Sequence, residues 1–504
     1  MTPVQRSWRR CAATKSESVC LFGSGAGSQL INCEMEKSTS YGQEIQPKVA
    51  TTALVTNGNQ NHAETHQLDQ KVANTLSSGN GNQHIELVIS IKEMVESSLD
   101  PPLSSNECCI YRIPIDLLKL NEEAYTPQII SIGPFHHGSK RLEPMEKLKL
   151  KYFKRFLQRI DFNVEILVND IKQHEESVRG CYAESIKLSS DAFVKLILVD
   201  GCFLIELFYE LRFQGAYSVS CENLLNPLLL ERIILDLKLL ENQLPLFALD
   251  ILFRLACAPD DDEHPSFTSL AIKAFEVYND WQFPENREAQ QIRHFVDLTK
   301  TFFVPSSSQL LSPQESNDLP SAVHLYTASQ LYKAGVKFKV SSSKCLFDLK
   351  FTNGTLEIPY IGLDNTTETI YRNVIAFEQC HYPCDSHFTD YIVLLNLLIN
   401  TPKDVELLIR KGIIMNGLSN NDAVASLFND LGTNISYDGW ECAYRGLFRD
   451  LNAFYSNTKH TWKATLKRDY FGTPWKIAST TGVITLLLLT LVQAICSIIQ
   501  VVKM

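Results

Sequence analysis

The 504-residue sequence lacks the short motifs that mark the common enzyme families. It contains no G-x-S-x-G elbow, no Walker loop, no H-E-x-x-H helix and no protein-kinase signature set. The glycine-rich stretch at residues 23–27 does not lie between a strand and a helix, so it has no phosphate-binding context. Because these motifs are absent, the sequence gives no support for catalysis and favours the hypothesis that the protein is not an enzyme.

Positive charge is also in short supply. The chain carries a formal net charge of −10 at pH 7, and its isoelectric point is near 5.7. A general nucleic-acid binder normally presents a basic face, so no nucleic-acid partner is expected.

Cysteines are too sparse for a disulfide scaffold. The 14 cysteines are spread along the chain, and Cys202 and Cys496 lie inside apolar runs, as reduced and buried cysteines do. The adjacent pair Cys108-Cys109 is not a C-x-x-C redox motif. The pattern indicates a domain that faces a reducing compartment.

No secretory signal is apparent at the N-terminus. The first residues are basic and rich in serine, and their single apolar run is too short for a signal peptide. They weakly resemble a transit peptide, and two interpretations stay open: translation begins at Met1, or at Met35 with the preceding segment unused. Residues 1–84 are of low complexity and lack apolar periodicity, so we predict a disordered extension.

The longest apolar run lies at the C-terminus. From Ile477 to Val502 there are 26 residues without a charge. As a helix this run would be roughly 39 Å long, against about 30 Å for the hydrocarbon core of a bilayer. Trp475 lies where an interfacial aromatic residue belongs. A buried core helix seldom runs so long without a charge, so we predict one transmembrane helix over residues 475–502.

The flanking charges predict the orientation of this helix. Basic residues are concentrated before it, with a single one after it: Lys459, Lys463, Lys467, Arg468 and Lys476 against Lys503. Positive charge favours the cytosolic side, so we expect a single-pass, tail-anchored protein whose bulk faces the cytosol, in the plasma membrane or an endomembrane. Three glycosylation sequons, at Asn353, Asn365 and Asn434, point weakly the other way and can report on topology.

Helical periodicity dominates residues 85–470. The stretch from about Pro144 places Met145, Leu148, Tyr152, Phe156 and Ile160 on one face, with lysines and arginines on the other. Three further helices are predicted. One is central and apolar and starts at Ser190, one runs from Pro227 through Gln243, and one has Pro402 in its first turn.

Two departures from helix are expected within this domain. Residues 259–320 are rich in Asp, Ser and Pro and are predicted to be a loop-rich linker. Residues 345–363 alternate between apolar and polar around Asn353-Gly354, which predicts a β-hairpin with a type I′ turn. The fold class predicted is therefore mainly α: a large multi-helix domain with a small inserted antiparallel hairpin and a C-terminal transmembrane helix.

Two adjacent histidines stand out in the stretch SIGPFHHG at residues 131–138. His136 and His137 are open to three interpretations: metal ligands, a catalytic base, or parts of a turn. Neighbouring side chains diverge, so one metal ion would rarely bind both, and no nucleophile is apparent nearby in sequence. The flanking Gly133-Pro134 and Gly138 favour a rigid loop whose histidines bond backbone groups or a buried acid.

A second cluster combines the residue types that zinc prefers. Four such residues fall within eight positions: Cys380, His381, Cys384 and His387. Pro383 interrupts any common helical face, and the spacing matches no zinc family. A structural role is favoured, with metal binding as the alternative.

Polar residues set in apolar surroundings form a third group of candidates. Asp200, Glu241 and Glu378 lie in apolar runs, together with the neighbouring amides: Asn242, Gln243 and Gln379. A buried carboxylate is costly unless it is paired or hydrogen-bonded. We expect one interior network with Arg112, Arg372 and a histidine of the loop, serving either core specificity or a ligand or acid–base site.

Several of these stretches carry a family resemblance. The segments are CCIYRIPIDLLKLNEEAYTPQIISIGPFHHG, LVDGCFLIELF, DLKLLENQLPLF, AGVKFK, GTLEIPYI with YRNVIAFEQC, and YFGTPWKIAS before the apolar terminus. In this order, over roughly residues 85–500, they resemble the plant-specific domain of unknown function 247 family. The resemblance implies a large helical domain with a C-terminal membrane helix, and assigns no catalytic residue or cofactor. Some relatives in grasses are linked with pollen–stigma self-incompatibility, which implies a recognition role; the extension before His84 departs from the family pattern.

Three functional hypotheses follow. The first is a membrane-anchored recognition, signalling or scaffold protein with a protein partner and no cofactor. The second is a hydrolase or transferase that uses the histidine loop with Asp200, Glu241 or Glu378. The third is an extracellular recognition module whose sequons carry glycans.

Overall fold

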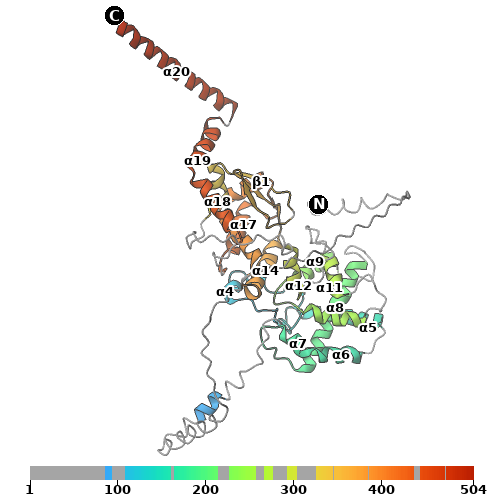
Figure 1. The fold of residues 1–504 in the computed structure, drawn as a ribbon. Coiled ribbons are helices and arrows are strands. Elements are labelled where there is room, and N and C mark those ends of the chain that lie inside the picture. Colours follow the sequence, from blue (N-terminus) through green and yellow to red (C-terminus); the bar gives the residue numbers. More distant parts are fainter. Residues whose placement is uncertain are drawn as a thin grey trace, which may run out of the picture. The chain divides into compact units, whose positions relative to one another are not determined.

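The computed structural model describes residues 86–92, 108–160, 164–213, 226–256, 266–275, 292–303, 325–343, 345–383, 385–435, 443–471 and 473–503. Two units divide the chain at residues 96 and 97, and the first contributes one described stretch, the helical residues 86–92. The predicted extension at 1–84, with the alternative start at Met35, lies outside the described residues. The described fold is mainly helical with small sheets, as predicted (Figure 1).

Within the described residues, eight helices build one hydrophobic core: α5 (Glu143–Ile160), α6 (Val164–Gln173), α7 (Glu175–Gly180), α8 (Ser190–Phe213), α9 (Pro227–Asp236), α10 (Leu246–Ala256), α11 (Phe267–Phe275) and α12 (Phe295–Phe303). The short α4 (Ile115–Leu118) and η1 (Glu122–Ala124) come before them in the chain but lie against the second core, described below. Helix α8 is apolar on nearly all sides, and α5, α6, α10 and α11 pack around it. The predicted central helix is confirmed, and it begins at Ser190 as expected.

Helix α5 has the predicted amphipathic pattern, with one exception. Tyr152 and Phe156 are fully buried against α8, and Met145 is buried one turn earlier. Lys149 is also fully buried, although the lysines of this helix were expected on the outer face. It follows Met145 by four residues and precedes Tyr152 by three, so helical periodicity places it on the core face.

Two helices lie within the segment 259–320, so the expected linker is wrong for those residues. The ring of Phe208 stacks on Phe295 of α12 at 5.4 Å between centroids and meets Phe267 of α11 edge-on at 5.3 Å. Asp250 accepts the backbone amide of Thr268 at 3.1 Å and so caps the start of α11. Aromatic burial against α8 orders two short segments that are flanked by polar sequence.

The predicted helix from Pro227 through Gln243 ends early, at Asp236. Beyond it the chain makes tight turns over residues 237–243, here called turn 237–243. The Nε2 of Gln243 donates to the carbonyls of Leu237 and Leu239 at 2.7 and 2.6 Å. A buried side-chain amide thus bonds carbonyls that a continuing helix would have bonded to its own backbone.

The second core is built by helices around the small sheets. They are α13 (Ala328–Ala334), α14 (Thr367–His381), α15 (His387–Leu398), α16 (Pro402–Arg410), α17 (Asn421–Leu431), α18 (Arg445–Ser456), α19 (Thr458–Thr465) and the π-helical η4 (Leu466–Tyr470). Pro402 occupies the first turn of α16, and Gly432 ends α17, as the sequence predicts.

The predicted hairpin is confirmed and belongs to a larger sheet. Strands β2 (Lys350–Thr352) and β3 (Thr355–Ile358) are antiparallel, and both Asn353 and Gly354 have positive φ, at 50° and 73°. This is the backbone conformation of a type I′ turn. Strand β1 (Lys337–Val340) adds a parallel partner to β3, and β4 (Ile361–Leu363) pairs in parallel with β5 (Ile414–Asn416). Neither parallel pair was predicted.

Asn373 of α14 connects the two cores. Its Oδ1 accepts the backbone amide of Leu240 at 2.9 Å, and its Nδ2 donates to the carbonyl of Ala124 at 2.8 Å. Leu240 belongs to the second core, whereas Leu237, three residues earlier in the same turn, belongs to the first. Turn 237–243 therefore lies against α14, at the junction of the two cores.

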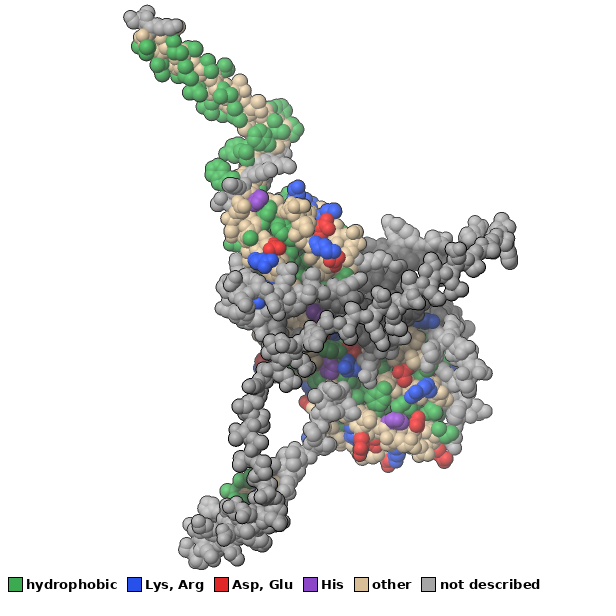
Figure 2. Space-filling model, in the orientation of Figure 1, with side chains coloured by type: hydrophobic (Ala, Val, Ile, Leu, Met, Phe, Trp, Pro, Cys, Tyr) green, Lys and Arg blue, Asp and Glu red, His purple; other side chains and the backbone are tan. Residues whose placement is uncertain are grey.

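The C-terminal helix α20 (Pro474–Lys503) has little buried surface of its own. Within the described part of the chain, Pro474–Val502 is the helix long and apolar enough to cross a membrane, with mean hydropathy 2.4 and none of its most apolar stretch buried. Figure 2 shows its hydrophobic side chains lining the helix along its length. The predicted long apolar helix is confirmed as a helix.

Candidate functional site

The carboxylate of Asp236 holds the histidine loop through hydrogen bonds to its backbone. Three successive backbone amides of this loop, here defined as residues 127–138, donate to its two oxygens: Gln128 at 2.9 Å, Ile129 at 2.7 Å and Ile130 at 2.9 Å. Burial raises the pKa of Asp236, and the three amides oppose that rise. The sequence analysis did not single out Asp236, because an acid at the last turn of an amphipathic helix resembles a solvated one.

Asn242 continues the same attachment. Its Oδ1 accepts the amide of Ile132 at 2.7 Å, and its Nδ2 donates to the carbonyls of Ile130 and Asp236 at 3.1 and 3.0 Å. The side chain is completely buried and uses both its acceptor and its donors. Asn242 therefore fixes loop 127–138 to turn 237–243, because its side chain bonds both an amide and a carbonyl of the loop backbone, as a paired strand would.

Asp200, on α8, holds the next residue of the loop. Its Oδ2 accepts the amide of Gly133 at 2.9 Å, while its Oδ1 pairs with the Nζ of Lys149 at 2.7 Å. The Lys149 ammonium also contacts Glu146 at 2.7 Å. Asp200 thus has two partners with full or partial positive charge, which compensates for its burial.

Gly133 is confined at this point of the loop. Its φ is +76°, and a Cβ added there would lie 2.3 Å from the carbonyl oxygen of Gln243. The hydroxyl of Tyr182 donates to that same oxygen at 3.0 Å. The rigid loop expected from the glycines is therefore present, and at Gly133 both the backbone angle and the packing require glycine.

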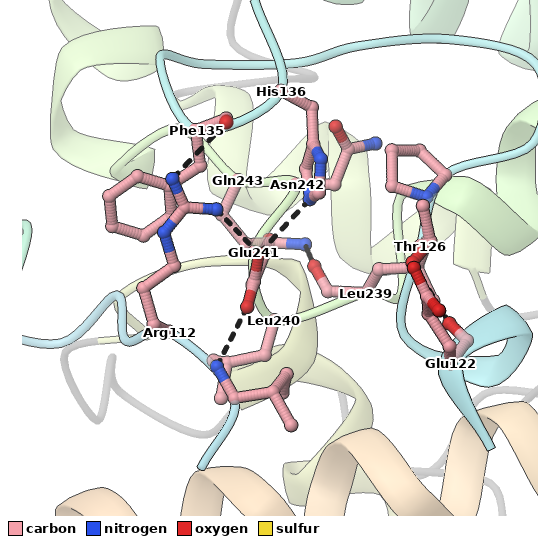
Figure 3. Close-up of polar contacts among 12 residues, drawn as sticks. Arg112, Glu122, Thr126, Phe135, His136, Leu239, Leu240, Glu241, Asn242 and Gln243 are labelled. Atoms are coloured by element: carbon pink, nitrogen blue, oxygen red, sulfur yellow. Dashed lines mark hydrogen bonds and ion pairs between the residues drawn. The ribbon is translucent and has the colours of Figure 1, made fainter. Parts of the chain in front are cut away.

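Glu241 is the centre of the partly open side of the site (Figure 3). One oxygen accepts the amide of Ile113 at 2.8 Å. The other lies 2.7 Å from the Nη1 of Arg112 and 3.2 Å from the Nε2 of His136. Burial acts to raise the pKa of Glu241, but these three partners outweigh it and lower the pKa below its ordinary value. The predicted link between Glu241, Arg112 and a loop histidine is present.

Arg112 covers this side of the loop. Its guanidinium carbon lies 4.2 Å from the centroid of the Phe135 ring, and its Nη2 donates to the Phe135 carbonyl at 3.3 Å. Its Nε contacts Glu184, also at 3.3 Å. The Arg112 side chain is 38% exposed and that of His136 is 17% exposed. The Nε2 atom of His136 that meets Glu241 is nevertheless buried, so the exposed part of the ring lies away from this contact.

His137 does not join the site. It is exposed, and Gly138 beside it has a φ of +80° with nothing within 4 Å of an added Cβ. The two histidines diverge as adjacent side chains of an irregular loop do. Of the two candidates, His136 alone contacts a carboxylate.

Glu378 lies in a separate polar group, so the single interior network that we expected is wrong in part. Its carboxylate accepts the amides of Phe388 and Thr389 at 3.1 and 2.8 Å and the Thr389 hydroxyl at 2.7 Å. Lys300 lies 3.7 Å away. Burial raises the pKa of Glu378, against the opposing effect of Lys300. The carboxylate binds free amides at the start of α15, which favours that helix terminus.

Arg372 also differs from the expectation. Its Nε pairs with Glu368, one turn earlier on α14, at 2.9 Å. The buried polar groups therefore divide into a loop-holding set around Asp200, Asp236 and Glu241 and a helix-capping set around Glu378. The sets are separate because α14 and α8 belong to different cores.

The predicted metal ligands have other partners where they are described: Cys380, His381, Cys384 and His387. The Nδ1 of His381 lies 2.9 Å from the Tyr111 hydroxyl, and the Nε2 of His387 lies 2.6 Å from Asp385. Burial raises the pKa of Cys380 to about 11, which disfavours the thiolate that a metal requires. The part of the chain that the structure describes holds no group of three His, Cys, Asp or Glu able to bind a metal; Cys384 lies outside that part.

A buried histidine that the sequence analysis passed over lies at the junction of the cores. The Nε2 of His294 is 2.9 Å from the carbonyl of Cys109, and its ring meets Phe377 edge-on at 4.6 Å. Burial lowers the pKa of His294 to about 3, so it is neutral near pH 7. No local pattern could have found it, because Cys109, whose carbonyl it contacts, is 185 residues away in sequence.

The site defines a class of protein: a helical domain in which buried carboxylates and amides fasten a histidine loop, followed by a long apolar helix. The chain belongs to the domain of unknown function 247 family, described as plant protein of unknown function, whose profile matches residues 110–489. The fastened loop, turn 237–243, α14 and most of α20 all lie within the matched residues. The resemblance inferred from the sequence segments is thereby confirmed.

Two relatives from Arabidopsis thaliana are similar over most of their length. One UPF0481 protein is 28% identical over 421 residues, which covers 78% of this chain and 87% of the relative. Another UPF0481 protein is 23% identical over 505 residues, covering 79% of this chain and 93% of the relative. No solved structure matches this chain.

Proposed function

We propose that this protein is a membrane-anchored recognition or scaffold module, with α20 in the bilayer and the helical domain on the cytosolic side, where it binds a protein partner. The observation that carries the proposal is α20. Its span Pro474–Val502 has 29 residues and a mean hydropathy of 2.4, and the described residues of the chain bury none of its most apolar stretch. A bilayer supplies that environment and matches its length.

The state of the buried carboxylates supports recognition over catalysis. Asp200, Glu241 and Glu378 each accept at least one backbone amide and each lie near a cation. A carboxylate used in this way holds chain segments in place, whereas a general base needs a free lone pair directed at substrate. The groups most suited to chemistry by type are therefore occupied in maintaining the fold.

The topology of the chain tests the membrane proposal directly. The full chain is translated with microsomes, and the membranes are extracted with alkaline carbonate, treated with protease and examined for N-glycans. We expect a carbonate-resistant protein whose bulk is digested and unglycosylated. Release by carbonate would refute anchoring through α20, and glycosylation with protection from protease would refute the cytosolic orientation.

The sequons make this assay informative because all three acceptor asparagines are exposed. Asn353 lies in the hairpin turn, Asn365 in the turn before α14, and Asn434 at the end of α17. Burial would therefore not prevent glycosylation if the domain entered the lumen. Asn353→Gln, Asn365→Gln and Asn434→Gln are matched controls that assign any shift in mobility to a particular site.

A second candidate function is an acid–base enzyme, favoured by one contact. His136 and Glu241 lie 3.2 Å apart with the histidine partly exposed, which is the arrangement of a base and its orienting carboxylate. Beyond this contact, Nε2 of His136 has no hydrogen-bond partner among the described residues. A nucleophile would have to come from the substrate or from water.

Paired histidine variants separate the two candidates. His136→Ala removes a partner of a buried carboxylate, so under the recognition proposal it lowers the free energy of unfolding, by about 1–3 kcal/mol. His137→Ala, at an exposed position, serves as the control and should leave stability unchanged. If His136→Ala melted like the wild type but lost the biological phenotype, the enzyme hypothesis would replace the structural role of this histidine.

A further inference from the structure

Helix α19 has two faces with different surroundings. One face packs on the domain: the His460 ring stacks on Phe454 at 4.2 Å between centroids, and the Cβ of Ala464 lies 3.1 Å from a Cβ built on Gly335. Trp462 lies two residues from each of these, which is about 200° around the helix axis. Its side chain is 80% exposed. The domain contacts thus direct Trp462 outward.

The outward face continues as a stripe of large apolar side chains toward α20. We define the α19 stripe as Trp462, Leu466, Tyr470 and Phe471, all of which are exposed. The next large side chain is Trp475, 86% exposed, at the start of α20. Single exposed apolar residues are ordinary, but four between Trp462 and Phe471, followed by a second tryptophan at Trp475, mark a surface that is covered in use.

The charges of the same segment are almost all positive. From Thr458 to Lys476 the sequence contains one acid, Asp469, against five basic residues: Lys459, Lys463, Lys467, Arg468 and Lys476. The first three recur every four residues in sequence, a period close to one helical turn. A helix with aromatic residues on one face and lysines beside it is typical of segments that lie in a membrane interface.

We propose that the α19 stripe lies in the headgroup region of a bilayer that carries anionic lipids, and so seats the domain on the membrane surface. This inference rests on the proposed membrane anchoring by α20. Tyr470 precedes Pro474 by four residues, so at about 3.8 Å per residue it lies within roughly 15 Å of the point where α20 begins.

The chemistry of both components fits an anionic interface. Indole and phenol rings are enriched at the headgroup level, where one edge meets lipid and the other meets water. Clusters of lysine and arginine beside a membrane helix are attracted to anionic lipids. Because α19 is packed on α13 and α18, placing the stripe in the interface would also restrict the tilt of the whole second core relative to the bilayer.

Tryptophan quenching by brominated lipids tests the proposal on the full chain. The protein is reconstituted in vesicles of phosphatidylcholine brominated near the top of the acyl chains, with or without phosphatidylserine. Trp462→Phe and Trp475→Phe are compared with the wild type. We expect each variant to lose part of the quenched emission, and the Trp462-dependent part to increase several-fold when phosphatidylserine is present.

The two tryptophans separate the failure of this inference from the failure of anchoring. If Trp475→Phe lowered the quenched emission and Trp462→Phe did not, α20 would be inserted and the stripe would be in water, which would overturn the inference alone. If neither variant changed quenching and carbonate released the protein, anchoring would fail as well.

Charge reversal tests the role of the basic residues. The triple variant Lys459→Glu, Lys463→Glu, Lys467→Glu should lose the increase in Trp462 quenching that phosphatidylserine produces. Trp475 quenching serves as the internal control, because it reports whether α20 itself is inserted in the triple variant. An undiminished increase in the triple variant would show that the stripe does not recognise anionic headgroups.

Discussion

Lys149 and Asp200 form a fully buried ion pair, with the Nζ of the lysine 2.7 Å from Oδ1 of the aspartate and neither side chain exposed. Burial acts against the ammonium, but the carboxylates of Asp200 and Glu146 outweigh it and raise the pKa of Lys149. Because Asp200 also accepts the Gly133 amide, the pair connects α5, α8 and loop 127–138. The histidine loop thus depends on a lysine whose helical position predicts burial, although its residue type predicts a solvated side chain.

Removing the cation from this pair should be strongly destabilising. Lys149→Met keeps much of the side-chain volume but leaves Asp200 buried with the Gly133 amide as its remaining partner. We expect the free energy of unfolding, measured with urea, to fall by about 3–5 kcal/mol, the usual cost of an uncompensated buried charge.

The surface pair of Lys172 and Asp191 supplies the control. These side chains lie 2.8 Å apart but are 45% and 87% exposed. Lys172→Met should leave the urea midpoint unchanged, because solvent screens an exposed pair. Equal effects of the two lysine substitutions would mean that burial of Lys149 does not determine its contribution.

Two glycines of the loop should respond differently to alanine. At Gly138 the φ of +80° is strained for alanine but the space is open, so Gly138→Ala should cost about 1 kcal/mol. At Gly133 the φ is similar and the added Cβ also meets the Gln243 oxygen at 2.3 Å. Gly133→Ala should cost several times more, about 3 kcal/mol or above, because the loop must move off turn 237–243.

Urea unfolding of both alanine variants measures this difference. A Gly133→Ala variant no less stable than Gly138→Ala would contradict the close approach of the loop to turn 237–243. Near-UV circular dichroism would show whether the loop relaxes locally around Phe135 and Tyr182, whose rings meet edge-on at 5.4 Å.

Asp236 should be sensitive even to an isosteric change. Asp236→Asn leaves one acceptor oxygen for three amides and turns an NH₂ group toward one of the N–H donors. Oδ2 accepts Ile129 and Ile130, and Oδ1 accepts Gln128. We expect a loss of about 2 kcal/mol in unfolding free energy, since a buried donor is left unsatisfied.

Hydrogen exchange locates the effect of this substitution. The amide of Gln128, Ile129 or Ile130 should exchange faster in Asp236→Asn, while amides of the β2–β3 hairpin should not change. Asp191→Asn, at an exposed carboxylate, is the matched control for loss of a negative charge. Unaltered exchange in residues 128–130 would argue against the contacts of Asp236.

Asp390 should give the protein a particular pH dependence. Burial raises the pKa of Asp390 to about 7, although its Oδ2 accepts the amide of Ala443 at 2.9 Å. An acid with a raised pKa in the folded state contributes stability below its unfolded pKa of about 4, and that contribution is lost as the pH rises toward 7. The loss over this window should be about 2–4 kcal/mol.

Asp390→Asn isolates this contribution from other titrating groups. Asparagine keeps an acceptor for Ala443 and does not ionise, so the difference in unfolding free energy between variant and wild type should grow from pH 4 to pH 7 in favour of the variant. His294 and His381, whose pKa values burial lowers to about 3 and about 4, titrate in both proteins and cancel in this difference. A difference that does not vary with pH would refute the raised pKa of Asp390.

Local sequence was sufficient where the cause of the structure is local. The β2–β3 hairpin follows from Asn353-Gly354, because both residues tolerate the positive φ of a type I′ turn. The start of α8 at Ser190 follows from its local serines, since the Oγ of Ser189 accepts the amide of Ala192 at 3.4 Å. The length and apolar character of α20 follow from composition, and the family follows from ordered sequence segments.

Contacts between distant residues account for what the sequence did not predict. Helix α9 ends at Asp236 because the Asp236 carboxylate and the side-chain amide of Asn242 bond a loop more than a hundred residues earlier in the sequence. Lys149 is buried because α8 offers it a carboxylate 51 residues later. His136 was a candidate from its flanking glycines, but its contact with Glu241 required the loop and the turn to be brought together.

The same distinction separates the two polar groups. In sequence, Glu241 and Glu378 look alike, each followed by an amide in an apolar run. In the fold, Glu241 lies in turn 237–243 beside Arg112 and His136, whereas Glu378 lies on α14 beside the start of α15, which it caps. Residue type predicted that each carboxylate would need partners, since burial of an unpaired charge is costly. Which partners it has depends on how the helices pack.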